Sequence, residues 1–300
     1  NLYVRLKAGE NGGAWSSKPA GYHIDTKDTS DELRVDKIWY SFPVGDNITG
    51  FFGPRIENYY MYVTPSIYKP GALKAFKLGG NSNFGASTDV GFGFKYEADN
   101  GFAVATNVVD KNADAANGGF FQDDSVSKWD TQVAYTADRY HLSLTYSNAQ
   151  NWTSQLYNAT ALGENTATDS TGYAARAYWM PEETGTAIPE ISVGYDVKHW
   201  DDAAAGTVDE AESWMVGLTW KDMIRADDRI GVALTQPLKA TGLAGGGDTG
   251  EVDDPLLWEV YYSWKHNDSM TITPAIFGGS DSFQEDDDTF GAVVTTAFKF

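Results

Sequence analysis

The chain of 300 residues contains no cysteine. This absence excludes disulfides, thiolate metal sites and cysteine nucleophiles. Histidine is also rare, and its four positions are His23, His141, His199 and His266. They show no spacing typical of metal ligands, and the chain contains neither a nucleophile elbow nor a phosphate-binding glycine loop. The sequence therefore predicts a protein that is not an enzyme and that uses no metal and no cofactor.

Long hydrophobic runs are missing as well. No stretch approaches the roughly 18 uninterrupted apolar residues that a membrane-spanning helix needs. That excludes helical membrane proteins, but it leaves a membrane β-barrel open, because barrel strands need apolar residues only at every second position. Acidic residues outnumber basic ones, 42 against 22, and the net charge of −20 argues against a nucleic-acid partner.

What the chain does contain is a repeated alternation of apolar and polar side chains. In RYHLSLTYSN, residues 139–148, four apolar or aromatic residues alternate with polar ones. Successive side chains of a β-strand point to opposite faces, so this segment predicts a strand with one apolar and one polar face. Similar segments predict about fourteen strands. Their ranges are 1–8, 33–43, 48–54, 88–97, 101–109, 128–136, 139–147, 171–180, 189–199, 211–221, 229–236, 256–266, 269–277 and 289–300. Pro274 cannot donate to a ladder, so we expect a bulge there.

The connections between these segments alternate in length. Short turns such as PVGDN, ADNG, TAD and HNDS separate long connections at 9–32, 55–87, 110–127, 148–170, 200–210, 237–255 and 278–288. Short turns at one end and long loops at the other are typical of outer-membrane up-and-down barrels. We therefore expect an all-β fold, a transmembrane antiparallel up-and-down β-barrel that occupies residues 1–300 as a single domain.

A run near the start, VDKIWYSFPVGDNITGFFG at residues 35–53, resembles the strand-turn-strand of the cyanobacterial Som-type porins. These are relatives of the carbohydrate-selective OprB-like porins and of iron uptake porins. NLYVRLKAG at the start, FKYEADNGFAVATNVV in the middle and the last strand, which ends in Phe300, are similar in kind.

The resemblance implies a homotrimer in the outer-membrane lipid of a Gram-negative-type, cyanobacterial cell. It also implies a barrel of about sixteen strands, of which about fourteen fall in this chain. In that family a surface-layer-homology domain that holds peptidoglycan, and a pair of barrel strands, precede the equivalent of NLYVRLKAG. We expect these parts to lie before residue 1, and any export signal too, since no signal pattern follows Asn1.

The polar faces of the strands carry mainly basic residues, and we expect these faces to line a lumen. The predicted pore-lining residues are Arg5, Lys7, Lys95, Lys128, Arg139, His141, Arg176, Lys198 and Lys265. Aromatic residues near the ends of the apolar faces are typical of girdles at the membrane interfaces. The predicted lipid-facing girdle residues are Trp179, Trp214, Trp220, Trp258 and Trp264.

Acidic residues gather in the long connections. They include Asp123, Asp124, Asp201, Asp202 and the run Glu285 to Asp288. We expect an acidic outer rim above a basic channel, a field that gathers cations first and then admits small anions. The alternative is that the loop acids only keep the surface hydrated and the lysines only snorkel.

The connection at 55–87 is long and rich in aromatic residues, and loops of such length in compact proteins are usually functional. We expect it to fold into the barrel as a constriction. Its candidate residues are Arg55, Lys69, Lys74 and Lys77. The alternative is that the loop packs on a neighbouring subunit.

These features favour an outer-membrane porin, a passive diffusion channel for small solutes and inorganic ions. One alternative is a substrate-specific channel for sugars or iron, in which Tyr3, Tyr178 and Tyr261 form an aromatic slide in the lumen. Only the specific channel would show saturable binding. A further alternative is a soluble carbohydrate-binding β domain, whose outward aromatics would have to be buried against each other.

Overall fold

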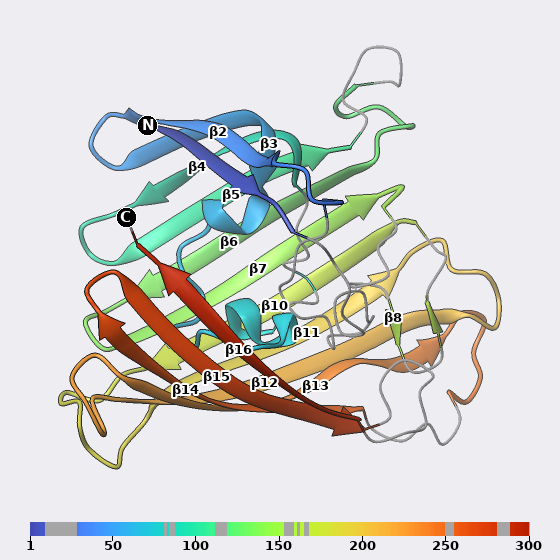
Figure 1. Cartoon of the computed structure of the whole chain (residues 1–300). Helices are drawn as coiled ribbons and strands as arrows, with labels where there is room; N and C mark the ends of the chain where they lie inside the picture. Colours follow the sequence, from blue (N-terminus) through green and yellow to red (C-terminus); the bar gives the residue numbers. More distant parts are fainter. Residues whose placement is uncertain are drawn as a thin grey trace.

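A computed structural model describes residues 1–9, 29–80, 83, 88–111, 119–152, 159–160, 163–164, 168–249, 255–280 and 289–299. Fourteen of its strands form one antiparallel sheet, in which each strand pairs with the next along the chain (Figure 1). They are β1 (Leu2–Lys7), β2 (Arg34–Val44), β3 (Ile48–Glu57), β4 (Thr88–Glu97), β5 (Phe102–Asp110), β6 (Ser127–Thr136), β7 (Tyr140–Gln150), β10 (Ser170–Trp179), β11 (Glu190–Trp200), β12 (Val208–Lys221), β13 (Arg229–Leu243), β14 (Leu256–Asn267), β15 (Met270–Ser280) and β16 (Thr289–Phe298). The expected all-β, up-and-down fold is confirmed.

The arrangement of connections also follows the sequence pattern. Figure 1 shows both termini at the end of the sheet that carries the short turns, and the strand ends that border the long connections at the opposite end. One of these long connections contains a separate two-stranded pair, β8 (Ala159–Thr160) and β9 (Gly163–Glu164). We call the two ends of the sheet the turn end and the loop end.

Two of the expectations that differ from the structure involve prolines. β13 continues seven residues beyond its predicted end, through Pro237, because the ladder between β12 and β13 shifts register opposite it, between Glu212 and Trp214. The expected bulge at Pro274 is wrong. The residue pairs on either side of Pro274 keep one register. In an antiparallel sheet, successive residues of a strand bond alternately to the strand on one side and to the strand on the other. The one N–H donor that proline lacks therefore does not shift the ladder.

The sheet has two edges. β1 pairs with β2 and β16 pairs with β15, and no pairing between β1 and β16 is present in the residues that the structure describes. The expectation of about sixteen strands in the whole protein stays a prediction.

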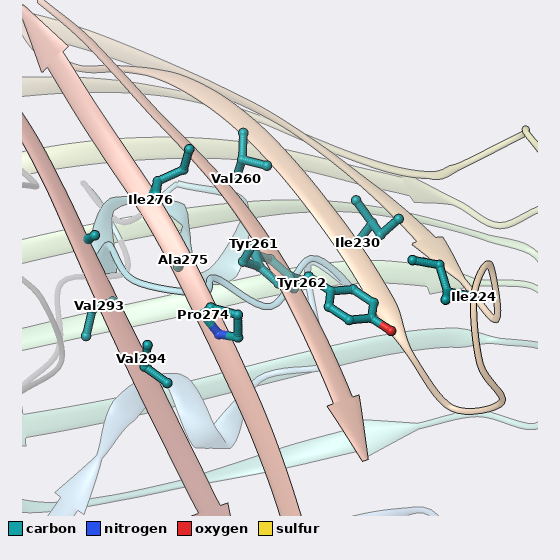
Figure 2. A pocket seen from close by; sticks show the side chains of 11 residues that line it. Ile224, Ile230, Val260, Tyr261, Tyr262, Pro274, Ala275, Ile276, Val293 and Val294 are labelled. Carbon is teal, nitrogen blue, oxygen red and sulfur yellow. The ribbon is translucent and has the colours of Figure 1, made fainter. Parts of the chain in front are cut away.

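The two faces of the sheet show the reverse of the pattern usual in a soluble protein, because apolar side chains are exposed and polar ones are buried. On β7 the side chain of Leu144 is 67% exposed, whereas the neighbouring polar residues Ser143 and Thr145 are buried. The same alternation on β6, β10 and β11 places apolar side chains outward and polar ones inward. The outer face stays apolar beside Pro274, where Ile230, Val260, Tyr262, Ile276 and Val294 are among the residues that line a shallow groove (Figure 2).

The connection between β3 and β4 contributes apolar packing on the inner side of the sheet. It contains two short 3-10 helices, η1 (Asn58–Met61) and η2 (Lys74–Gly79), drawn in blue and teal inside the sheet in Figure 1. Leu73 and Phe76 pack there against Met215, Leu257 and Phe277 of the strands. Of the helices within the described ranges, none is long and apolar enough to span a membrane.

Candidate functional site

The candidate site is the interior of the sheet, where the connection between β3 and β4 crosses from one wall to the other. We call its described residues, 58–80 and 83, the inner loop. η1 contacts β3, β4 and β5, whereas η2 contacts β11, β12 and β13. The expectation that this connection folds inward therefore agrees with the structure.

A buried carboxylate from β14 holds the middle of the inner loop. Glu259 accepts hydrogen bonds from three successive backbone amides, those of Gly71 (2.9 Å), Ala72 (3.0 Å) and Leu73 (2.9 Å). The hydroxyl of Tyr68 donates to the same carboxylate at 2.8 Å. Position 71 must be glycine, because a Cβ there would lie 2.6 Å from the side chain of Tyr261.

A buried guanidinium from β10 holds the end of the inner loop. Arg176 donates to the backbone carbonyls of Leu78 (2.9 Å) and Gly80 (3.0 Å), and it forms an ion pair of 2.7 Å with Asp196. The wall leaves room for this contact at Gly194, where a Cβ would come within 1.7 Å of the carbonyl oxygen of Gly79.

Side chains of β6 hold the beginning of the inner loop. Gln132 accepts from the amide of Val63 at 2.9 Å and donates to its carbonyl at 3.0 Å. The side-chain amide of Asn58 donates to Asp130 at 2.7 Å. Polar side chains on strands far apart in the sheet thus fix both halves of one loop, and this explains why so many inward polar groups are buried.

Another group of charges lies on the first three strands. Arg5 and Lys7 pair with Asp36, and Lys37 pairs with Glu57. Sequence reasoning missed Asp36 and Glu57, and it also missed Glu190, which pairs with Lys221. Glu57 ends β3 and Glu190 begins β11, and Asp36 lies at the register shift between β1 and β2. Parity is a weak guide at such positions.

The predicted pore-lining residues fall into distinct environments. Lys128, His141, Arg176 and Lys198 are buried on the inner face. Lys128 donates to the carbonyl of Asn83 in the inner loop, and Arg176 pairs with Asp196. Arg5, Lys7 and Lys95 are partly exposed and paired with acids.

Two of the predicted lining residues, Arg139 and Lys265, lie at the turn end. Arg139 lies at the turn end, where its guanidinium stands 5.5 Å from the ring centre of the outward Trp179 and bonds to the carbonyl of Met180. Lys265 also lies at the turn end, paired with Asp227 and Asp268. Strand parity predicts that both side chains point inward, but residues of the neighbouring turns bind these long side chains at the strand ends.

The tryptophans predicted for the girdle all lie on outward-facing strand positions. Trp179, Trp220 and Trp264 lie near the turn end, and Trp214 and Trp258 lie toward the loop end. Trp220 donates to the carbonyl of Ala187 at 2.9 Å, as expected where an indole borders a polar region.

The candidate constriction residues are only partly on the inner loop. Lys69, Lys74 and Lys77 belong to it, whereas Arg55 is an exposed residue of β3 whose guanidinium donates to the carbonyl of Asp36. The predicted strand ended at residue 54, whereas β3 continues to Glu57 and includes Arg55.

The three tyrosines of the predicted aromatic slide lie in different environments. Tyr178 stacks on His141, and Tyr261 is buried beneath the inner loop. Tyr3 instead stacks on Trp39, with ring centres 4.0 Å apart, and Tyr60 of the inner loop adjoins both rings. This aromatic group (Tyr3, Trp39 and Tyr60) lies beside the ion pairs of Arg5.

The outer acids are exposed where the structure describes them. Asp123, Asp124, Asp201 and Asp202 lie at the loop end, and all four are exposed. The run Glu285 to Asp288 lies outside the described residues.

Comparison with solved structures identifies the fold. OprB of Pseudomonas putida is similar with a TM-score of 0.57 and 15% identity over 89% of this chain and 72% of that one. OmpT, an outer-membrane protein of Vibrio cholerae in its trimer form, has a TM-score of 0.54 and 13% identity over 88% of this chain and 79% of its own. A mutant of Rh. blastica porin has a TM-score of 0.52 and 10% identity over 100% and 88%.

Sequence comparison adds no family. No protein-family model matches the chain, and no curated protein matches it. The fold is nevertheless that of outer-membrane β-barrel proteins, with fourteen antiparallel strands in one sheet and an inner loop across its interior.

Proposed function

We propose that this protein is an outer-membrane porin, a passive diffusion channel for small solutes and inorganic ions. The observation that carries the proposal is the reversed sheet, apolar outside and polar inside, together with a loop anchored across its interior. An apolar outer face suits lipid, and a polar inner face suits water. No chemical turnover is involved in this proposal, because a channel works by its radius and by the charges along its wall.

The wider setting is part of the same proposal. The protein is a homotrimer in the outer membrane, in keeping with the described trimer form of OmpT from Vibrio cholerae. The resemblance to the Som-type porins favours a cyanobacterial source and attachment to peptidoglycan through a domain outside this chain. The barrel is a single domain.

The charges of the interior support a refined view of selectivity. Most of the basic side chains expected to line the lumen are paired with acids, for example Arg176 with Asp196 and Arg5 with Asp36. Paired charges exert weak fields at a distance. Ion selectivity in this proposal therefore comes from the few lumen cations that no nearby acid neutralises, and from the acidic residues at the loop end.

The test is conductance of the full-length protein in planar bilayers. Discrete current steps with a reversal potential in a salt gradient are expected, and heat-unfolded protein is the control. A folded protein that inserts in the bilayer but gives no steps would contradict the proposal.

A second candidate function, a sugar-specific channel, is favoured by the aromatic group at Tyr3, Trp39 and Tyr60. The ring of Tyr60 is 45% exposed and could stack on a sugar beside hydrogen-bonding charges. In this case glucose or a short glucan would inhibit the ion current in a saturable way, and Tyr60→Ala would weaken the inhibition. Phe102→Ala, which removes an exposed outward ring, is the matched control.

A further inference from the structure

Three cationic side chains converge on the inner face near the turn end. Lys221, at the end of β12, and Arg229, at the start of β13, are cross-strand partners on inward-facing positions. Glu190, at the start of β11, pairs with Lys221 at 2.5 Å. Glu190 thus pairs with one of two neighbouring cations before the inner loop is considered.

The inner loop brings the third cation. The amides of Ile67 and Tyr68 donate to the hydroxyl of Ser192, each at 3.2 Å, and Ser192 lies two positions after Glu190 on the same inward face of β11. On the other side, the amide of Gly71 is held by Glu259. Lys69 lies between these two anchors, so its place on the inner face is fixed.

The charges of this cluster do not balance. Lys69 and Arg229 have no ion pair or side-chain hydrogen bond with any residue in the part of the chain that the structure describes. The charge of Arg229 and then burial, with a smaller effect of Lys221, lower the pKa of the Lys69 amine against the opposing effect of Glu190. Like charges held close without neutralisation favour an anion that can bridge them.

We propose that Lys69, Lys221 and Arg229 form an oxyanion-binding site at the turn end of the lumen. The inference rests on the proposed channel function, since it names the class of solute that would pause in that channel. The ligand is a small solute with several charged oxygens, such as inorganic phosphate. A guanidinium presents a planar fork of donors that suits two oxygens of one group, and the two ammonium groups supply further charge. A single-atom anion such as chloride offers these donors only one acceptor atom.

The first experiment measures binding and needs no current. Folded full-length protein in detergent is dialysed against radiolabelled inorganic phosphate at low ionic strength. We expect saturable binding, with a half-saturating concentration about tenfold higher in Arg229→Gln and in Lys69→Gln, because each variant loses a charge-assisted contact.

The matched control is Lys265→Gln. Lys265 is a lysine on the inward parity of β14 and at the same end, but it is already paired with Asp227 and Asp268. Its replacement should leave phosphate binding unchanged. Circular dichroism and heat-modifiable gel migration verify that each variant is folded. Absence of saturable binding to the folded wild type, or equal binding in the wild type and in both cluster variants, would overturn the site.

The second experiment separates this inference from the proposed function. Phosphate added to a chloride-conducting channel should interrupt the current at concentrations that match the dialysis result, and the interruption should weaken in Arg229→Gln. A channel that conducts chloride while the protein fails to bind phosphate overturns the oxyanion site alone. Phosphate binding by folded protein that gives no current supports the site and contradicts the channel.

Discussion

The outer and inner faces of the sheet follow opposite rules. Outward positions such as Leu142, Leu144 and Val133 are exposed and apolar, whereas inward positions such as Asp130, Asp196 and Glu259 are fully buried and charged. On the outer face each side chain acts nearly independently, through its contact with the surrounding medium. On the inner face the charges act together, because each one holds a particular part of the inner loop or another charge.

The difference shows that polar residues on a barrel's inner face can have a structural role. Arg176 and Glu259 would be read from the sequence as lining a channel, yet both are buried and satisfied by the inner loop. The groups left to meet a solute are those that the loop does not cover.

The largest effect is expected from Glu259→Leu on the inner face. The substitution leaves three loop amides and the hydroxyl of Tyr68 without their acceptor, and we expect unfolding free energy to fall by about 4 kcal/mol. Urea unfolding in lipid vesicles, followed by tryptophan fluorescence, measures this loss. Released loop segments should also make the single-channel current noisier.

Glu259→Gln is the graded comparison, because it keeps one acceptor oxygen and should lose less stability. Ser263→Ala, on the same strand and the same face, is the control for a change outside the anchor. Equal stability of wild type and Glu259→Leu would mean that the loop is not held by this carboxylate.

On the outer face we expect a smaller effect from Leu144→Arg. A cation on the lipid-facing side near the membrane midplane costs about 2 to 3 kcal/mol. The same unfolding measurement in vesicles tests this value, with Leu144→Phe as the apolar control. A change below about 0.5 kcal/mol, as is usual for a residue on a water-exposed surface, would show that this face does not meet lipid.

Much of the fold could be predicted from the sequence, because the relevant signal is local. Alternation along ten residues, as in 139–148, fixes both the strand and its outward face, and the turn sequences fix the order of pairing. β13 was predicted too short because Pro237 looks like a strand end until its partner strand is known.

The interior site could not be predicted to the same depth, because its contacts join residues far apart in the chain. Nothing near Glu259 in the sequence shows that Gly71 will lie against it, 188 positions away. Likewise, parity marked Lys221 and Arg229 as inward, but only the position of Lys69 on the inner loop reveals the cluster. Parity also failed at strand ends, as at Arg139.

A third prediction concerns the turn between β12 and β13, which belongs to neither face of the sheet. The buried Asp228 carboxylate accepts from the amides of Met223, Ile224 and Arg225 and from the hydroxyl of Tyr262. Burial alone would raise the pKa of Asp228, but these hydrogen bonds outweigh it and hold the pKa below its ordinary value of 3.8. Asp228→Asn should therefore cost about 1 to 2 kcal/mol at neutral pH.

The lowered pKa determines how the contribution of Asp228 to the free energy of unfolding changes with pH. The unfolded chain binds a proton more readily than the folded one, so the contribution of Asp228 is complete above about pH 5 and is lost as the pH falls through the lowered pKa. Urea unfolding of wild type and Asp228→Asn at pH 7 and at pH 3 should show the two proteins converging at the lower pH. If the difference in unfolding free energy between the two proteins were the same at both pH values, the ionised carboxylate could not be the source of that difference.

The smallest effect is expected from Arg139→Gln at the turn end, where the outer and inner faces meet. Its partner Glu182 is exposed, and exposed pairs contribute less than about 1 kcal/mol, so unfolding free energy should change little. Because the guanidinium stands over the outward Trp179, we also expect the reversal potential in a salt gradient to match that of the wild type. Arg229→Gln, a loss of the same charge from the inner face, should shift that potential toward cations. If Arg139→Gln shifted the reversal potential as much as Arg229→Gln, charges on both faces of the turn end would act on ions in the lumen. The position of a charge along the barrel axis would then matter more than the face of the sheet that carries it.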